Sequence, residues 1–267
     1  MSSGSNPDTP LLRLDHCTIR FGGLTAVSDL SFQIGPHDLV GLIGPNGAGK
    51  TTVFNMITGV YRPTEGDIAL GGISLVGKKP FKIAKMGIAR TFQNIRLFHS
   101  LSVYDNVRSA FNMHLRHGIA HALFHGKGLH IEEKEIESKV MEILEIFGLQ
   151  GHRDCDAKSL PYGDQRRLEI VRALATNPRL LLLDEPAAGM NPTEKAELMN
   201  LIQFVKDKFS IAVLLVEHDM KVVMGICQRI VVLDYGMKIG EGSPAEIRTN
   251  PEVIKAYLGE PVGGTHA

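Results

Sequence analysis

The segment Gly44-Pro-Asn-Gly-Ala-Gly-Lys-Thr51 decides the fold class, because it matches the pattern G-x-x-x-x-G-K-[ST] at every fixed position. It follows a near-continuous apolar run, Leu39 to Gly44, and precedes a segment, Lys50 to Thr58, that can form a helix. Such an apolar run is typical of a strand buried on both faces of a parallel sheet. A strand, a glycine-rich turn and a helix in this order predict a phosphate-binding loop.

Each residue type in this loop has a chemical reason. Glycines let backbone N–H groups turn toward phosphates, and the following helix offers its positive N-terminus. Lys50 is expected to reach the β- and γ-phosphates, and Thr51 to give an oxygen to Mg²⁺. An accidental match would occur in roughly one chain per hundred. The sequence therefore predicts nucleotide binding by Gly44, Pro45, Asn46, Gly47, Ala48, Gly49, Lys50, Thr51 and Thr52.

A second stretch, Leu180-Leu-Leu-Leu-Asp184-Glu185, predicts a buried strand that ends in two carboxylates. Ligands of open α/β sheets bind at this end of the strands. Asp184 can hold Mg²⁺ there, directly or through water, and Glu185 is placed to accept a proton from an attacking water. Strands often end in acidic residues, so the upstream phosphate loop is what favours this interpretation.

The composition limits the other possibilities. With 267 residues, 43% hydrophobic and 22% charged, the chain is expected to fold as one large domain or two small ones. Lys+Arg and Asp+Glu total 29 each, which argues against a strongly basic nucleic-acid-binding surface. No apolar run approaches the ~18 residues that cross a bilayer. Residues 1–10 suggest a disordered tail, and the 3 scattered cysteines favour a reducing, cytosolic compartment.

Strand and helix patterns alternate at both ends of the chain, which indicates a parallel sheet covered by helices. The middle, from about residue 102 to 168, shows only helical periodicity, as expected for an inserted helical subdomain. One apolar stripe there is expected to end at Gly148. The expected strands are 12–21, 30–34, 39–44, 180–184, 211–217 and 230–234; the expected helices are 193–208 and 218–227; and the stripe is Ile136, Val140, Ile143, Leu144 and Phe147.

The remaining motifs resemble those of ATP-binding-cassette (ABC) ATPases, in family order, over residues 11 to about 245. Leu160-Pro-Tyr-Gly-Asp-Gln-Arg-Arg-Leu-Glu169 resembles the signature motif, in a variant form with Tyr162 and Asp164. Gln93 resembles the Q-loop glutamine, Gly189-Met-Asn-Pro192 the D-loop, His218 the switch histidine, and Phe21 the aromatic residue that stacks on adenine. A GTPase would need an Asn-Lys-x-Asp tetrapeptide, and no Asn-Lys pair occurs. A small-molecule kinase rarely carries a long helical insert followed by a segment like Leu160 to Glu169.

The resemblance implies an α/β fold: a P-loop NTPase core with a mostly parallel sheet, N-terminal antiparallel strands and an inserted helical subdomain. It implies a single ATPase domain over residues 11–267, with the RecA-like β core in residues 11–92 and 170–245, the helical subdomain in 93–169, and a C-terminal helix and tail in 246–267. It implies ATP and Mg²⁺ as cofactors. The implied catalytic residues are Glu185, His218, Gln93 and Lys50; the metal-binding residues are Thr51, Gln93 and Asp184; and Phe21, Tyr162 and Gly163 join the loop in nucleotide binding.

Within the family, the motifs resemble the longer ATPase subunit of branched-chain amino-acid importers. Residues 111–131 occupy the place of that subunit's extra segment, and Asn250-Pro-Glu-Val-Ile-Lys-Ala-Tyr-Leu-Gly259 is similar to its tail. The implied partners are a shorter homologous ATPase (or a second copy in isolation), two membrane-spanning permeases and, indirectly, a solute-binding protein. The chain would lie at the cytoplasmic face of the cell membrane and bind no nucleic acid. The alternatives are a soluble ABC ATPase acting on ribosomes, DNA or cluster assembly, and a regulatory nucleotide-binding module.

Two positions depart from the family pattern. Pro161 stands where the signature usually has Ser, and it supplies neither a side-chain donor nor a backbone N–H. We expect the helix to begin at Gly163, whose N–H would keep a weakened phosphate site. Asn191 replaces the more familiar Asp of the D-loop.

Three further features have simpler interpretations. Histidines 114, 117, 121, 125 and 130 could hold Zn²⁺, but glycines 118, 126 and 128 weaken that helix, so a solvated or membrane-facing segment is favoured. The Glu-rich run 132–137 is expected to be a solvated helix face. Leu97 and Phe98 could form a docking groove for a permease helix, with core packing as the alternative.

Overall fold

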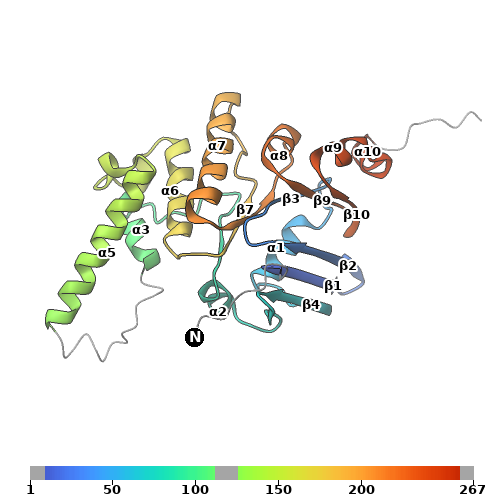
Figure 1. Ribbon diagram of the computed structural model, residues 1–267, viewed down its shortest axis with the longest axis horizontal. Helices are drawn as coiled ribbons and strands as arrows, with labels where there is room; N and C mark the ends of the chain where they lie inside the picture. The colour runs from blue at the N-terminus through green and yellow to red at the C-terminus, as the bar shows by residue number, and fades with distance from the viewer. Residues whose placement is uncertain (1–9, 112–125, 259–267) are drawn as a thin grey trace, which may run out of the picture.

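The computed structural model describes residues 10–111 and 126–258, which form two β-sheets with helices around them (Figure 1). An antiparallel sheet has the strand order β2-β1-β4-β5, and a larger sheet has the order β10-β9-β3-β8-β7-β6. The strands are β1 (Leu12–Phe21), β2 (Leu24–Ile34), β3 (Leu39–Ile43), β4 (Glu65–Leu70), β5 (Ile73–Ser74), β6 (Ile88–Arg90), β7 (Leu180–Asp184), β8 (Ala212–Val216), β9 (Arg229–Asp234) and β10 (Met237–Gly242).

Strand β3 lies inside the larger sheet, between β8 and β9, and pairs with both in parallel. All five of its residues are buried, as the apolar run predicted. Only β10 runs antiparallel to its neighbour in this sheet. The sheet is therefore mostly parallel, and the expected fold class is confirmed. Strands β4, β5, β6 and β10 were not predicted, because they are short or only partly buried and show no long apolar run.

Two hydrophobic clusters cover the two faces of the larger sheet. Successive residues of each strand point to opposite faces, so in β7 Leu181 and Leu183 join one cluster while Leu180 and Leu182 join the other. The first cluster includes residues of α6 (Tyr162–Leu174), α7 (Pro192–Phe209), α8 (Met220–Ile226) and α9 (Pro244–Thr249), and the second includes residues of α1 (Lys50–Ile57) and of the antiparallel sheet (Figure 1). The helices around this core are α1 (Lys50–Ile57), α2 (Pro80–Lys85), α7 (Pro192–Phe209), α8 (Met220–Ile226), α9 (Pro244–Thr249) and α10 (Pro251–Leu258).

The middle of the chain is helical, as its periodicity predicted. Its helices are α3 (Val103–Phe111), α5 (Gly126–Ile146) and α6 (Tyr162–Leu174), and an isolated bridge from Ser102 to Asp156 is its one β-pair among the described residues. The apolar stripe of α5 is buried at Val140, at Leu144 and at Phe147 just beyond the helix end, and Gly148 follows with a left-handed φ of 69°. The domain boundaries given above stay a prediction.

Some of the remaining sequence expectations concern segments that lie partly or wholly outside the described residues. Among the described residues, no helix has the length and apolar character to span a membrane, and no three side chains of His, Cys, Asp or Glu form a group that could hold a metal ion. Histidines 114, 117, 121 and 125 lie outside the described residues, as does most of the expected N-terminal tail. The solvated face of α5 is present: Glu133, Glu135 and Glu137 are exposed.

Candidate functional site

The phosphate loop joins β3 to α1 at the centre of the larger sheet. Its backbone needs glycine: Gly44 has a φ of 152°, and a Cβ atom there would lie 2.1 Å from the Leu233 carbonyl oxygen. Gly49 caps α1 with a left-handed φ of 100°. At Gly47 nothing lies within 4 Å of the position of a Cβ atom. The loop is therefore closely packed against β9 on one side and open on the other, where a phosphate group has room to approach.

Lys50 is held inside this loop. Its Nζ donates to the carbonyl oxygens of Gly44 at 2.7 Å and Pro45 at 2.8 Å. Burial lowers the pKa of Lys50, and the nearby carboxylates of Glu185 and Asp184 oppose that shift. The ammonium is thus positioned in advance, at the place where the motif requires a positive charge.

A hollow of about 520 Å³ lies over the phosphate loop. Phe21, at the end of β1, lies at this hollow, is 44% exposed and makes an edge-on contact with the ring of Tyr61 at 5.1 Å. The structure therefore brings together most of the residues that the sequence assigned to nucleotide binding. The hollow is lined by Phe21, Leu24, Thr25, Ala26, Asn46, Gly47, Ala48, Gly49, Lys50, Thr51, Thr52, Glu185 and Tyr235.

Asp184 ends β7 and is nearly buried. Its Oδ2 accepts from the Arg90 guanidinium at 2.7 Å, and Arg90 also donates to the Asn55 Oδ1 at 2.7 Å. The side chains of Arg90 and Asp184 are 9% and 8% exposed, so this ion pair is shielded from solvent. The sequence did not identify Arg90 as a site residue, because Arg90 and Asp184 are far apart along the chain and no local pattern indicates their contact.

Glu185 lies close to Gln93 and His218, the two side chains that were expected to act with it in catalysis. The Gln93 Nε2 donates to Glu185 Oε2 at 2.8 Å, and the His218 Nδ1 lies 3.6 Å from the same oxygen. Glu185 has a φ of 46°, a left-handed conformation that is unusual for a residue with a side chain. Its backbone N–H donates to Val216 at the end of β8. Strands β7 and β8 thus fix the carboxylate between Gln93 and His218.

Glu217 is a buried carboxylate beside this cluster that sequence reasoning also missed. It is fully buried and accepts from the backbone N–H groups of Ala187 at 2.7 Å and His218 at 3.1 Å. Burial raises the pKa of Glu217, while these donors lower it. Its contacts tie the turn after Glu185 to the segment that carries His218. The available signal was its position directly after the apolar strand β8, the same position that singled out Glu185 after β7.

The signature segment lies apart from the phosphate loop. Helix α6 begins at Tyr162, with Pro161 as its N-cap, so the expected start at Gly163 was wrong by one residue. Proline fits this place because the residue before a helix needs no N–H for the helical hydrogen bonds. Neither Tyr162 nor Gly163 lines the hollow over the phosphate loop of the same chain. In the D-loop, Asn191 forms a capping box with Glu194 at the start of α7.

The residues after Gln93 divide into a buried one and an exposed one. Leu97 is 7% exposed and belongs to the core, so the expectation that it lines a docking groove was wrong. Phe98 is 52% exposed and lies beneath the Arg172 guanidinium at 5.2 Å. It lines a hollow of about 320 Å³ whose walls come from β6, α3 and α6. Asn106 holds the main chain of Phe98 in this conformation: its Oδ1 accepts from the Phe98 N–H at 2.9 Å, and its Nδ2 donates to the Phe98 carbonyl oxygen at 3.0 Å.

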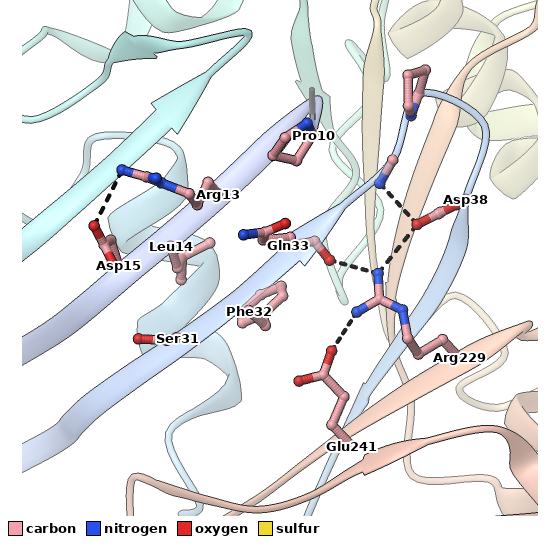
Figure 2. A pocket seen from close by; sticks show the side chains of 12 residues that line it. Pro10, Arg13, Leu14, Asp15, Ser31, Phe32, Gln33, Asp38, Arg229 and Glu241 are labelled. Carbon is pink, nitrogen blue, oxygen red and sulfur yellow. Dashed lines mark hydrogen bonds and ion pairs between the residues drawn. The ribbon is translucent and has the colours of Figure 1, made fainter. Parts of the chain in front are cut away.

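A separate hollow of about 530 Å³ lies between the antiparallel sheet and the start of β9 (Figure 2), and it shares no lining residue with the hollow over the phosphate loop. Arg229 fills one side of it: the guanidinium pairs with Glu241, with Asp38 at 3.1 Å and with the Gln33 carbonyl oxygen at 2.6 Å. These contacts satisfy the arginine within the chain and link the two sheets. We therefore interpret this hollow as part of a structural junction between the two sheets.

The comparisons with known proteins agree with this geometry. Residues 27–188 match the ABC transporter family, and residues 237–262 match the branched-chain amino acid ATP-binding cassette transporter family. The chain therefore belongs to the ABC transporter family, whose ATPase domains bind ATP. It is 46% identical over 251 residues to the high-affinity branched-chain amino acid transport ATP-binding protein LivG of Escherichia coli K12, covering 94% of this chain and 98% of LivG.

Further relatives extend this likeness. BraF of Pseudomonas aeruginosa, also a high-affinity branched-chain amino acid transport ATP-binding protein, is 45% identical, with 94% of this chain and 98% of BraF covered. Among solved structures, the ABC transporter cassette MJ1267 in its ADP conformation superposes with a TM-score of 0.81 at 30% identity, covering 94% of this chain and 99% of MJ1267. The similarity thus spans nearly the whole chain.

Proposed function

We propose that this chain is the ATP-hydrolysing subunit of an importer for branched-chain or related hydrophobic amino acids. The position of Glu185 is the main support for ATP hydrolysis. Its carboxylate accepts a hydrogen bond from Gln93, lies 3.6 Å from His218 and borders the hollow over the phosphate loop. The substrate class rests on the resemblance to LivG and BraF. The balanced charge and the same relatives disfavour an ATPase that acts on ribosomes or DNA.

In this proposal Glu185 is the general base. Its carboxylate takes a proton from the attacking water, a role that asks for a carboxylate within hydrogen-bonding reach of that water. His218 and Gln93 orient the water and the γ-phosphate from either side of Glu185. Lys50 and the N–H groups at the start of α1 stabilise the charge on the phosphate oxygens. Phe21 stacks on the adenine.

The donor set near the loop fits Mg²⁺. Thr51, Gln93 and Asp184 offer hydroxyl, amide and carboxylate oxygens, the ligand types that Mg²⁺ prefers. The Arg90 guanidinium holds Asp184 Oδ2 at 2.7 Å, which restricts the motion of this carboxylate. When bound, the ion would offset the negative charge of the phosphate oxygens.

The active unit in this proposal is a pair of ATPase chains. Tyr162 and Gly163 do not line the phosphate-loop hollow of their own chain, which supports a contact with the nucleotide of a second chain across an interface. The partner would be a shorter homologous ATPase, or a second copy in isolation. Two permeases would bind through the hollow that includes Phe98, and this contact would keep the pair at the cytoplasmic face of the membrane. A solute-binding protein would act from the opposite side.

The test is uptake of labelled leucine by proteoliposomes that contain the chain, its ATPase partner and the permeases. Uptake that requires internal ATP and is lost in a Glu185→Gln complex would support the proposal. Binding of the same complex to ribosomes or DNA, with no uptake of any hydrophobic amino acid, would contradict it and favour the alternative.

A further inference from the structure

A buried ion pair outside the expected motifs joins the signature helix to the Q-loop. Arg166 and Glu169 lie one turn apart in α6, their side chains are 1% and 3% exposed, and their charged groups are 2.6 Å apart. A buried pair of this kind contributes little net stability unless further hydrogen bonds satisfy it. Its role is therefore best sought in what else the two side chains hold.

Both side chains grip the main chain around Gln93. The Arg166 guanidinium donates to the carbonyl oxygens of Phe92 at 2.8 Å and Gln93 at 2.9 Å. The Glu169 carboxylate accepts from the N–H groups of Phe92 at 3.3 Å and Arg96 at 3.2 Å. The Q-loop backbone is thus fixed to α6 by four contacts in addition to the ion pair.

Tyr162 extends these contacts to the turn that follows Glu185. Its hydroxyl accepts from Arg166 Nη2 at 3.3 Å and donates to the Ala188 carbonyl oxygen at 3.1 Å. The Ala188 N–H donates to the Glu185 carbonyl oxygen at 3.2 Å. Since the Gln93 side chain donates to Glu185, the hydrogen bonds close a ring through the Q-loop, the catalytic carboxylate and the signature helix.

We propose that Tyr162, Arg166 and Glu169 form a positioning network that holds Gln93 and the turn after Glu185 in one fixed relation to the signature helix. The inference rests on the proposed function, because the network matters for catalysis only if Glu185 and Gln93 act on the same water. The Tyr162 hydroxyl is the link that spans two segments far apart in sequence. It acts on catalysis in its own chain, besides any contact that the signature makes with a partner's nucleotide.

The first measurement is hydrogen exchange of the isolated full chain, followed by mass spectrometry of its peptides. Tyr162→Phe removes only a hydroxyl from a ring that is 44% exposed, so folding should persist. It should speed exchange about five- to tenfold in residues 92–96 and 186–190, as expected for loss of one or two hydrogen bonds. Tyr104→Phe, the same change in α3, is the control and should leave both segments unchanged. Unaltered exchange in either segment of Tyr162→Phe overturns the network.

The second measurement is steady-state ATP hydrolysis by the assembled ATPase pair with its permeases. Tyr162→Phe should lower kcat about five- to tenfold with little change in KM, because it removes only the hydroxyl that bonds Arg166 and Ala188, while the ring and the main chain of the signature stay in place. In a Gln93→Ala background the same change should cost less than about twofold, since the network acts through Gln93. Equal losses in both backgrounds, or a change in KM alone, would overturn the inference. An inactive wild-type complex would instead refute the proposed function, while the exchange measurement still decides on the network.

Discussion

Pro161→Ser should tighten ATP-driven pairing of the two ATPase chains. In the structure Pro161 is exposed, caps α6 with φ −53° and ψ 153°, and makes no side-chain hydrogen bond to the first turn. A serine at this place can donate its hydroxyl proton to a partner's γ-phosphate. A charge-assisted hydrogen bond contributes about 1.5–3 kcal/mol, which is about ten- to a hundredfold in the association constant.

The same substitution also changes the stability of the isolated chain. A serine N-cap accepts from the N–H groups of the first helical turn and stabilises a helix by about 0.5–2 kcal/mol relative to a residue that cannot cap. Loss of proline's restricted unfolded state costs about 0.4–1 kcal/mol. The two effects nearly offset each other, so the melting temperature should move little. Pro161→Ala is the matched control, because it loses the proline without gaining a hydroxyl.

The assay is analytical ultracentrifugation of the chain with its ATPase partner and Mg-ATP, with Glu185→Gln in the background to prevent turnover. Pro161→Ser should lower the dissociation constant at least about tenfold relative to Pro161→Ala. Dissociation constants that agree for the serine and alanine variants, with both chains folded, would refute the reasoning. The signature would then bind phosphate through its backbone N–H groups alone.

Other substitutions test the rest of the site. Glu185→Gln should bind ATP normally yet lower kcat at least about a hundredfold, measured by phosphate release, because the general base is gone; near-normal turnover would refute its role. Phe98→Ala should leave ATP binding unchanged and weaken copurification with the permeases; an unfolded chain would instead favour a packing role. Lys195, 2.6 Å away, holds the pKa of Asp219 below its ordinary value of 3.8. That pair therefore stabilises the fold above pH 3.8 and loses its effect as the pH falls below that. Asp219→Asn should accordingly lower the melting temperature at neutral pH and less so in acid, and an equal loss at both would contradict this. Glu217→Ala should leave the Ala187 N–H unpaired and destabilise the chain by about 1–3 kcal/mol in urea unfolding, with Glu135→Ala, on the exposed face of α5, as the unaffected control.

The sequence by itself determined the parts of this protein that depend on local pattern. The strand, glycine turn and helix around Lys50 were predicted because a phosphate loop needs those residue types in consecutive order. The buried strand before Asp184 and the stripe that includes Val140 and Leu144 were likewise set by short apolar periodicities. These features involve residues within a few positions of one another, so no knowledge of distant contacts was needed.

Only the tertiary structure decided how distant segments meet. The order of the strands places β3 between β8 and β9, and this brings Glu185, Gln93 and His218 to one point. Leu97 is buried beside the exposed Phe98 in a turn whose main chain is hydrogen-bonded to Asn106, an arrangement that the apolar pattern of the sequence does not indicate.

The ion pairs of the site show the same limit. Arg90 meets Asp184 across 94 positions of the chain, and Arg166 reaches the Gln93 carbonyl across 73. From sequence alone, a charged side chain on a helix or strand is expected to be solvated, because the partner that permits its burial comes from another element. The local chemistry of nucleotide binding is therefore written in the motifs, while the buried charges that orient it arise only when the sheet and the helices assemble.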